Sequence, residues 1–204
     1  MSAYFAELSK ALKAAEIFRP CLVLDRDRLD ANIALVKQRL APGLAVRLVD
    51  KSLPCLPLLS HISKSLETGR FMTFHPPVTQ AVLDAFPAGD LLYGKPMPVG
   101  AAKAALARGD AGGWSRVCWL IDTPERLSEY GALAAAFGTE LRFAFEVDVG
   151  LHRGGFSGPA EIRALAIPKD LRCEGIMAYE AHAPEIPGLF GGAAGALKKA
   201  AAPN

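Results

Sequence analysis

The segment RLVDKSLP, residues 47–54, places a lysine directly after a run of apolar residues that is typical of a buried strand. A lysine at the end of such a strand is partly desolvated, and desolvation favours the neutral form of an amine. The neutral amine of Lys51 could therefore attack an aldehyde or ketone and form a Schiff base. The same position also suits a surface lysine that pairs with Asp50, so position alone leaves both interpretations open.

The segment FEVDVGLHRGGF, residues 145–156, carries the densest group of ionisable residues. Glu146 and Asp148 alternate within a strand-type run, which places both carboxylates on the same face of the strand. A glycine-rich turn follows and can bring His152 and Arg153 back over the end of that strand. By itself, the position of Arg153 is also compatible with a solvated loop.

Ionisable side chains follow the other strand-type runs as well. They are Asp25, His75, Lys95, Asp122, Tyr179, Glu180 and His182. The positions of Tyr179 and His182 also suit ordinary strand-end residues. The sequence has no nucleophile elbow that would support a Ser/His/Asp triad, and its histidines lack the spacing of metal ligands. A hydrolase triad and a metal centre are therefore disfavoured.

Strand-type runs alternate with helix-type runs along the whole sequence. We expect seven strands, at residues 21–25, 43–49, 71–75, 90–94, 116–122, 141–150 and 171–182. We expect six intervening helices, at residues 27–40, 55–67, 76–86, 99–109, 123–138 and 158–167. In the helix at 123–138, Thr123 is a candidate N-cap, Pro124 lies in the first turn and Gly138 marks the end.

The expected strands are nearly continuous apolar runs, which is typical of a parallel sheet covered on both faces. Two α/β architectures fit this pattern, a doubly wound open sheet and a (β/α)8 TIM-type barrel. The first strand-to-helix junction, residues 24–30, has no glycine fingerprint for a dinucleotide, and the sequence has no GxxxxGK[ST] phosphate loop. We therefore favour the barrel, whose active sites lie at the C-terminal ends of its strands.

The expected barrel is incomplete. About seven β/α units are visible, and the segment after the seventh strand, rich in glycine, alanine and proline, contains no eighth strand. A parallel barrel that lacks a strand has two open edges, which tend to pair with other strands. The sequence thus indicates either a piece of a longer protein or a barrel whose gap is closed by a partner or a second copy.

The composition is that of an ordinary globular protein, with 51% hydrophobic residues and a net charge of +2 among 204 residues. There is no run of like charges, so composition gives no reason to expect a nucleic acid or a membrane surface as partner. The four cysteines are widely spaced, and we expect buried free thiols in a reducing compartment. The N-terminus lacks the pattern of a signal peptide, and no apolar stretch is long enough for a membrane span. We expect a cytoplasmic protein.

Four motifs together resemble a known family. They are CLVLDRDRLDANIALV, VRLVDK, EVDVGLHRGG and EGIMAYEAH, in that order and spacing. They resemble the alanine racemase-like N-terminal barrel of fold-type III pyridoxal-phosphate (PLP) enzymes, and most closely the D-threonine aldolase and D-serine dehydratase group. The resemblance implies an N-terminal helical extension at 1–19, a partial PLP-binding barrel at 20–187 and a Gly/Ala-rich tail at 188–204. The β-rich C-terminal domain of that family is not visible in the sequence.

The resemblance implies a role for each of five residues. Lys51 matches the lysine that holds PLP through a Schiff base and later acts as a general base. Arg153 matches the arginine of the family stretch D-x-G-x-x-R-x-G, near the phenolic oxygen of the cofactor. Tyr179 matches a residue whose ring lies against the pyridine, and His182 follows it near the barrel mouth. Arg47 matches an inward-pointing arginine that orders the site.

The sequence also departs from the family pattern at two positions. Arg19 stands where the group usually has a threonine before the proline, and Val49 stands where it often has a histidine before the lysine. The loop that grips the PLP phosphate in the family lies near the eighth strand, which is not visible here.

The expected function is that of a PLP-dependent lyase acting on D-amino acids, similar to D-threonine aldolase or D-serine dehydratase. The resemblance leaves an amino-acid racemase, a non-catalytic PLP carrier and a truncated, inactive remnant open as alternatives. The expected partners of the protein are a small amino-acid substrate and, at full length, a second copy in a homodimer. A divalent metal is possible in the full-length family, but this sequence offers no ligands for one.

Overall fold

The computed structural model describes residues 3–108 and 111–182. The chain divides into two compact units, Met1–Pro42 and Gly43–Asn204, and each is described by itself. In the first unit, helices α1 (Ala3–Ala14) and α2 (Arg26–Arg39) are joined by a segment without regular structure. The side chain of Asp25 caps α2 by accepting a hydrogen bond from the backbone N–H of Arg28 at 3.0 Å.

The strand expected at residues 21–25 is not formed, which corrects the predicted strand count. These residues have no regular structure, and Leu22, Val23 and Leu24 are exposed. A strand exists only when its backbone pairs with a neighbouring strand. An apolar and β-branched composition is therefore not sufficient to make this stretch a strand.

The second unit is built on one parallel sheet of six strands, in the order β1-β2-β3-β4-β5-β6. The strands are β1 (Leu48–Val49), β2 (Arg70–Thr73), β3 (Asp90–Tyr93), β4 (Val117–Ile121), β5 (Leu141–Val147) and β6 (Leu171–Ala178). Each strand pairs in parallel with the next strand along the chain. This order, with every strand beside its successor, is the order within the wall of a (β/α)8 barrel.

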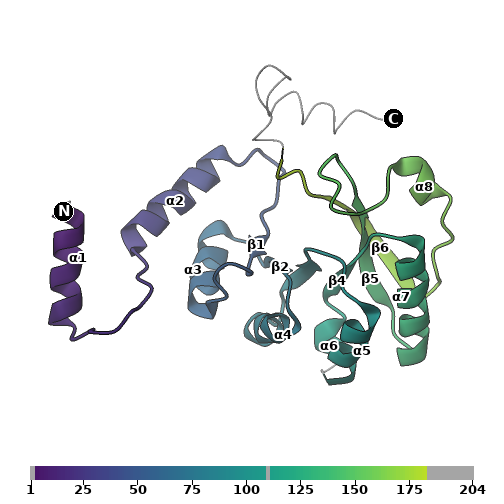
Figure 1. Ribbon diagram of the computed structural model, residues 1–204, viewed down its shortest axis with the longest axis horizontal. Helices are drawn as coiled ribbons and strands as arrows, with labels where there is room; N and C mark the ends of the chain where they lie inside the picture. The colour runs from purple at the N-terminus through teal and green to yellow at the C-terminus, as the bar shows by residue number, and fades with distance from the viewer. Residues whose placement is uncertain (1–2, 109–110, 183–204) are drawn as a thin grey trace, which may run out of the picture. The chain divides into compact units, whose positions relative to one another are not determined.

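Helices connect successive strands, and those between β1 and β5 lie along one side of the sheet (Figure 1). They are α3 (Leu56–Leu66), α4 (Pro76–Ala85), α5 (Val99–Arg108), α6 (Ala111–Trp114) and α7 (Pro124–Phe137), and α8 (Pro159–Arg163) follows β5. As predicted, Thr123 caps α7 by accepting from the N–H of Arg126, and Gly138 ends it in the left-handed conformation. The short helix α6 was not predicted, and α8 is shorter than its sequence pattern indicates.

The main core fills the space between the sheet and these helices. Its centre is an aromatic stack in which the ring of Trp119 lies 5.1 Å from Tyr93 and 5.9 Å from Trp114, centroid to centroid. The opposite face of the sheet carries a smaller apolar cluster around Leu92 and Leu120. Because both faces of the central strands are covered, their sequences are continuously apolar. The predicted fold class, an incomplete TIM-type α/β barrel, is confirmed, with six strands in the described residues in place of seven.

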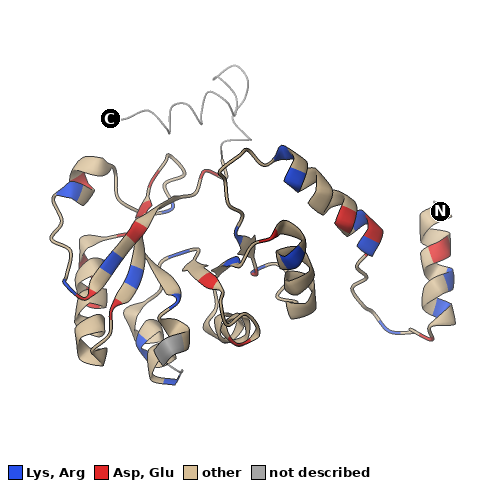
Figure 2. Cartoon of the chain, turned by 180° about the vertical axis from the view of Figure 1, so that it is seen from behind, with Lys and Arg blue, Asp and Glu red and all other residues tan. Residues whose placement is uncertain are grey.

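Charged residues lie on several of the strands (Figure 2). Four of them, Arg47, Asp90, Arg142 and Glu174, form a row of ion pairs across the sheet. The carboxylate of Asp90 forms ion pairs with the guanidinium groups of Arg47 at 2.5 Å and Arg142 at 2.8 Å. Arg142 also forms an ion pair with the carboxylate of Glu174 at 3.0 Å. Burial alone would raise the pKa of Asp90, but the two arginines outweigh it and hold that pKa below its usual range. The row therefore links β3, β5, β6 and the residue before β1 by ion pairs.

The cysteines are free, but they are not generally buried as we expected. Cys118 is buried, whereas Cys21 and Cys173 are exposed. Cys21 lies in the unpaired stretch of the first unit, and Cys173 lies on β6, which pairs with a strand on one side only in the described residues. Among the described helices, none is long and apolar enough to cross a membrane.

Candidate functional site

Lys51 lies just beyond the carboxyl end of β1 and faces two aromatic rings. Its Nζ is 4.8 Å from the ring centroid of Phe74, which follows β2, and 5.9 Å from that of Tyr179, which follows β6. The side chain of Lys51 is exposed, so the partial desolvation expected from the sequence is not observed. Nor is an ion pair formed with Asp50, whose side chain is buried, and no other ion pair of Lys51 occurs in the described part of the chain.

The turn after β5 is shaped by Asp148 and by glycines. One carboxylate oxygen of Asp148 accepts hydrogen bonds from the N–H groups of Gly150 and His152, at 2.9 and 3.0 Å. The other oxygen lies 2.7 Å from Nδ1 of His152. The His152 side chain and then these N–H groups hold the pKa of Asp148 below its usual range. This Asx-type turn reverses the chain so that Arg153 returns toward the sheet.

Gly155, the second glycine after Arg153, lies where the turn passes close to β5. Its φ is +104°, and a Cβ at this position would lie 2.7 Å from the backbone oxygen of Glu146. The approach is close because Phe156 bridges to β5, donating its N–H to the Glu146 carbonyl at 2.8 Å. Only glycine fits both the backbone conformation and the space.

The turn delivers the Arg153 guanidinium to a buried carboxylate. Nε of Arg153 donates to Oε1 of Glu146 at 3.0 Å, and Nη2 donates to the same oxygen. Glu146 is only 3% exposed, so its charge needs this partner. The carbon at the centre of the guanidinium lies 4.6 Å from the centroid of the Tyr179 ring. Arg153 is thus held between a buried acid and an aromatic face.

Three of the residues singled out by the sequence therefore meet at the carboxyl ends of the strands. The Tyr179 ring is near both cations, Lys51 and Arg153, as expected for cation–π contacts. Glu146 supplies one negative charge beside two positive ones, so the cluster carries a net positive charge. A lysine amine, an aromatic face and an excess of positive charge suit a planar ligand that bears a carbonyl group and negative charge.

His182 lies beside the turn that carries Arg153, whereas Arg47 lies at the other end of the strands. His182 lies beside the β5 turn, because a Cβ on Gly150 would be 3.5 Å from its Nε2, and its Nδ1 is buried without a hydrogen-bond partner in the described residues. Arg47 directly precedes β1 and lies four residues before Lys51, about 13 Å along an extended chain. Its guanidinium binds Asp90 and the carbonyls of Phe71 and Asp90. It therefore belongs to the row of ion pairs across the sheet.

The remaining strand-end residues take other roles. Asp122 pairs with Arg126 at 2.7 Å and thereby fixes the start of α7. His75 is the N-cap residue of α4, and Lys95 is exposed. In residues 3–108 and 111–182, no group of three or more His, Cys, Asp or Glu side chains could hold a metal ion.

Phe74 is a site residue that sequence reasoning missed, and Gly94 is the reason it can lie there. A Cβ on Gly94 would be 2.1 Å from Cζ of Phe74 and 2.9 Å from Sδ of Met72. The sequence signal was the glycine at the end of β3, which marks a close approach of another group.

Replacing Gly94 with alanine is expected to push the Phe74 ring away from Lys51. The overpacking should lower the free energy of unfolding by about 1–3 kcal/mol, measured by urea denaturation. Gly100, in the first turn of α5, is the matched control as Gly100→Ala, because a Cβ added there would meet nothing within 4 Å. Equal stability of the two variants would contradict the assignment of close packing at Gly94.

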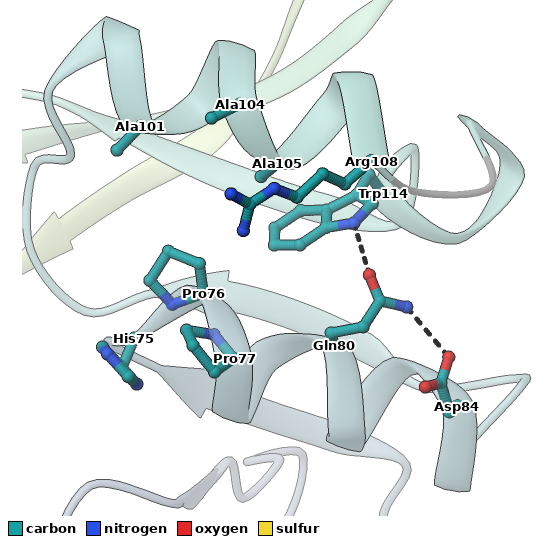
Figure 3. A pocket seen from close by; sticks show the side chains of 10 residues that line it. All are labelled: His75, Pro76, Pro77, Gln80, Asp84, Ala101, Ala104, Ala105, Arg108 and Trp114. Atoms are coloured by element: carbon teal, nitrogen blue, oxygen red, sulfur yellow. Dashed lines mark hydrogen bonds between the residues drawn. The ribbon is translucent and has the colours of Figure 1, made fainter.

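A cavity lies on the helical side of the sheet, between α4 and the α5–α6 segment (Figure 3). Its volume is about 760 Å³, and the indole of Trp114 lines it. Three of its lining residues are joined by hydrogen bonds, since the indole N–H donates to Gln80 at 2.7 Å and Gln80 donates to Asp84 at 2.9 Å. This cavity is lined mainly by helix residues and does not include Lys51.

Comparison with known proteins identifies the family. The family described as "Alanine racemase, N-terminal domain" matches residues 24–201. The chain belongs to this family. It is thus a fold-type III PLP barrel chain, as the four sequence motifs predicted. A search of curated proteins finds no significant match.

Three solved structures illustrate the fold that this chain shares. D-threonine aldolase from Filomicrobium marinum has a TM-score of 0.69 and 18% identity, over 91% of this chain and 50% of that one. Alanine racemase from Clostridium difficile 630 has a TM-score of 0.65 and 15% identity, over 85% and 45%. Alanine racemase from E. faecalis has a TM-score of 0.64 and 22% identity, over 86% and 48%. The alanine racemase N-terminal domain chain described here spans about half the length of these structures.

The residues of this alanine racemase-family domain fit the cofactor that the family implies. The amine of Lys51 has no anionic partner in the described residues and faces the rings of Phe74 and Tyr179. Arg153 adds a fixed cation beside one of these rings. Nδ1 of His182 is a buried polar atom without a partner in the same part of the chain. An aldehyde, an aromatic ring and a phenolate would each find a complementary group here.

Proposed function

We propose that this chain carries the PLP-binding lysine of an enzyme that acts on amino acids. The observation that supports this proposal is the convergence of the Lys51 amine, the Tyr179 ring and the Arg153 guanidinium at the carboxyl ends of the strands. Lys51 would hold the cofactor through its aldehyde carbon. Arg153 would lie near its phenolic oxygen, Tyr179 would pack against the ring, and His182 would lie near the mouth.

When bound, PLP supplies an electron sink for cleavage of a bond at Cα of an amino acid. Residues of this chain would transfer the proton and position the groups that take part. Once its amine is free, Lys51 would take or return the proton at Cα, as a general base and then a general acid. Glu146 would keep the guanidinium of Arg153 in one orientation, because two nitrogens of that group donate to one of its oxygens. Arg47 would act indirectly, by fixing the amino end of β1 through Asp90.

The reaction we propose is that of a D-amino-acid lyase, either retro-aldol cleavage or dehydration. The four-motif resemblance to the D-threonine aldolase and D-serine dehydratase group favours it. A racemase is the second candidate, because the matching family is described as the alanine racemase N-terminal domain. A homodimer in the cytoplasm is the proposed setting for the whole enzyme.

Cofactor capture tests the first part of the proposal. The chain is titrated with PLP and, in parallel, with 4-deoxypyridoxine 5′-phosphate, which lacks the aldehyde. We expect a new absorption band of a lysine-linked cofactor with PLP only. A new absorption band with both compounds, or with neither compound, would contradict capture through an amine.

Product analysis tests the reaction class. The PLP-treated chain is incubated with D-threonine, D-serine or alanine in deuterium oxide. Glycine and acetaldehyde would indicate an aldolase, pyruvate and ammonia a dehydratase, and deuterium at Cα of both enantiomers of alanine a racemase. Tight capture of PLP with none of these products would instead favour a non-catalytic carrier or an inactive remnant.

A further inference from the structure

Asp50, the residue before Lys51, has a side chain that is only 1% exposed. Because side chains alternate along an extended chain, Asp50 faces the helices while Lys51 faces the other side of the sheet. The backbone N–H of Asp50 donates to the carbonyl of Met72 at 3.1 Å, which extends the ladder between β1 and β2. Since β1 has only two residues, this bond is one of few that fix the backbone of Lys51.

Three buried hydroxyl groups continue from the carboxyl group of Asp50. They belong to Thr73 on β2, Thr79 on α4 and Tyr93 on β3, and all three side chains are fully buried. The nearest of the three to Asp50 is the Thr73 hydroxyl, which interacts with its carboxyl group. Oγ1 of Thr73 lies 2.7 Å from Oγ1 of Thr79, which lies 3.0 Å from the hydroxyl of Tyr93.

The direction of each hydrogen bond follows from the number of protons available. Oγ1 of Thr79 lies 2.9 Å from the carbonyl oxygen of His75, which can only accept, so the single proton of Thr79 goes there. Thr73 and Tyr93 must then both donate to the lone pairs of Thr79. With its only proton used, Thr73 has no proton left to donate to an ionised Asp50. A negative charge on Asp50 would therefore lack the support of this hydroxyl group.

The absence of a counter-ion near Asp50 in the described residues also favours a neutral carboxyl group. In residues 3–108 and 111–182, Asp50 forms no ion pair, and its Oδ2 has no hydrogen-bond partner. The titratable group that faces it is Tyr93 on β3, and burial raises the pKa of this tyrosine to about 12, so it remains a donor. Lys51 is on the opposite face, and β2 and α4 contribute the hydroxyls of Thr73 and Thr79. An ionised carboxylate here would be a buried charge without a counter-ion.

We infer that Asp50 is a neutral carboxylic acid in the folded protein, and that its burial among these hydroxyl groups anchors the end of β1 and so positions the amine of Lys51. The positioning role rests on the proposed function of Lys51, whereas the neutral state of Asp50 does not. Burial raises the pKa of Asp50 above its ordinary value, in agreement with a neutral acid.

The pH dependence of stability tests the neutral state in the chain without cofactor. Above the ordinary aspartate pKa of about 4, the unfolded chain releases a proton that folded Asp50 retains. Between that pH and the pKa of folded Asp50, unfolding of the wild type therefore becomes up to tenfold more favourable per pH unit from this group. Asp50→Asn keeps a neutral donor and removes this dependence. We expect wild type and D50N to be alike at pH 4 and D50N to be the more stable of the two at pH 8.

Asp90→Asn is the matched control, because the pKa of Asp90 is shifted in the opposite direction. The stabilisation from ionised Asp90 is present above its unfolded pKa and is lost as pH falls through its folded pKa. D90N should thus be less stable than wild type at neutral pH and approach it in acid. If D50N behaves like D90N, folded Asp50 is ionised and the inference is wrong.

Infrared difference spectra and cofactor capture complete the test. Wild type minus D50N at pH 7 should contain the carbonyl band of a protonated carboxyl group, and carboxylate bands alone would overturn the inference. With PLP and borohydride, we expect trapping on Lys51 to fall at least tenfold in Asp50→Ala and to be restored in D50N, with an unchanged pH profile. Equal trapping in D50A and wild type would remove the positioning role, whereas no trapping even in wild type would count against the proposed function alone.

Discussion

Replacing Lys51 with alanine is expected to abolish PLP capture while leaving the fold intact. The amine of Lys51 faces the rings of Phe74 and Tyr179, so its removal takes away the group that would join the aldehyde. Its side chain is exposed and has no ion pair in the described residues, so the free energy of unfolding should change by less than about 0.5 kcal/mol. Absorbance titration with PLP and urea denaturation measure the two effects.

Lys95→Ala is the matched control for Lys51→Ala. Lys95 is also an exposed lysine that follows a strand of the same sheet. We expect it to leave PLP capture unchanged. Capture that survives in Lys51→Ala, or that is lost equally in both variants, would show that another amine or a non-covalent site binds the cofactor.

Replacing Arg153 with methionine should produce the largest loss of stability among single changes at the site. The substitution leaves the charge of Glu146 buried and unpaired, and removing one partner of a buried ion pair costs about 3–5 kcal/mol. Arg153 is itself about one-third exposed, so the lower end of this range is expected. The fixed cation beside Tyr179 is lost as well, so cofactor capture should weaken. Urea denaturation and PLP titration measure these effects.

The double variant Arg153→Met with Glu146→Gln separates the ion pair from other packing effects. Without the carboxylate there is no unpaired charge, so stability should largely recover. Arg172→Met is the control on the surface, since Arg172 and Glu140 are each more than half exposed. It should cost at most about 1 kcal/mol. A double variant no more stable than Arg153→Met would show that the buried charge is not the cause.

Much of the fold could be predicted because local signals and tertiary structure agree. The helices begin and end near the caps that the sequence indicates, as Thr123 and Gly138 do for α7. The continuous apolar strands predicted a covered parallel sheet, and its strands lie in chain order. The motif around Asp148 predicted the turn that returns Arg153 to the sheet, because carboxylate and glycines act within that segment.

The errors arise where structure depends on distant partners. Residues 21–25 have a strand-type sequence but no regular structure, because a strand also depends on a neighbouring strand that its own sequence does not specify. The sequence allowed an ion pair between the neighbours Asp50 and Lys51, but the alternation of side chains along a strand places them on opposite faces. Phe74 and the binding of Arg47 to Asp90 depend on contacts between strands, which spacing along one segment does not reveal.

The most direct test of the account is to find which residue carries the cofactor. The wild-type chain is incubated with PLP, reduced with borohydride and digested, and the modified lysine is located by mass spectrometry. We predict a single major modification on Lys51, with the other lysines modified only at the level of a denatured control. Modification spread evenly over exposed lysines such as Lys95 and Lys103, with none enriched at Lys51, would contradict the assignment of this site.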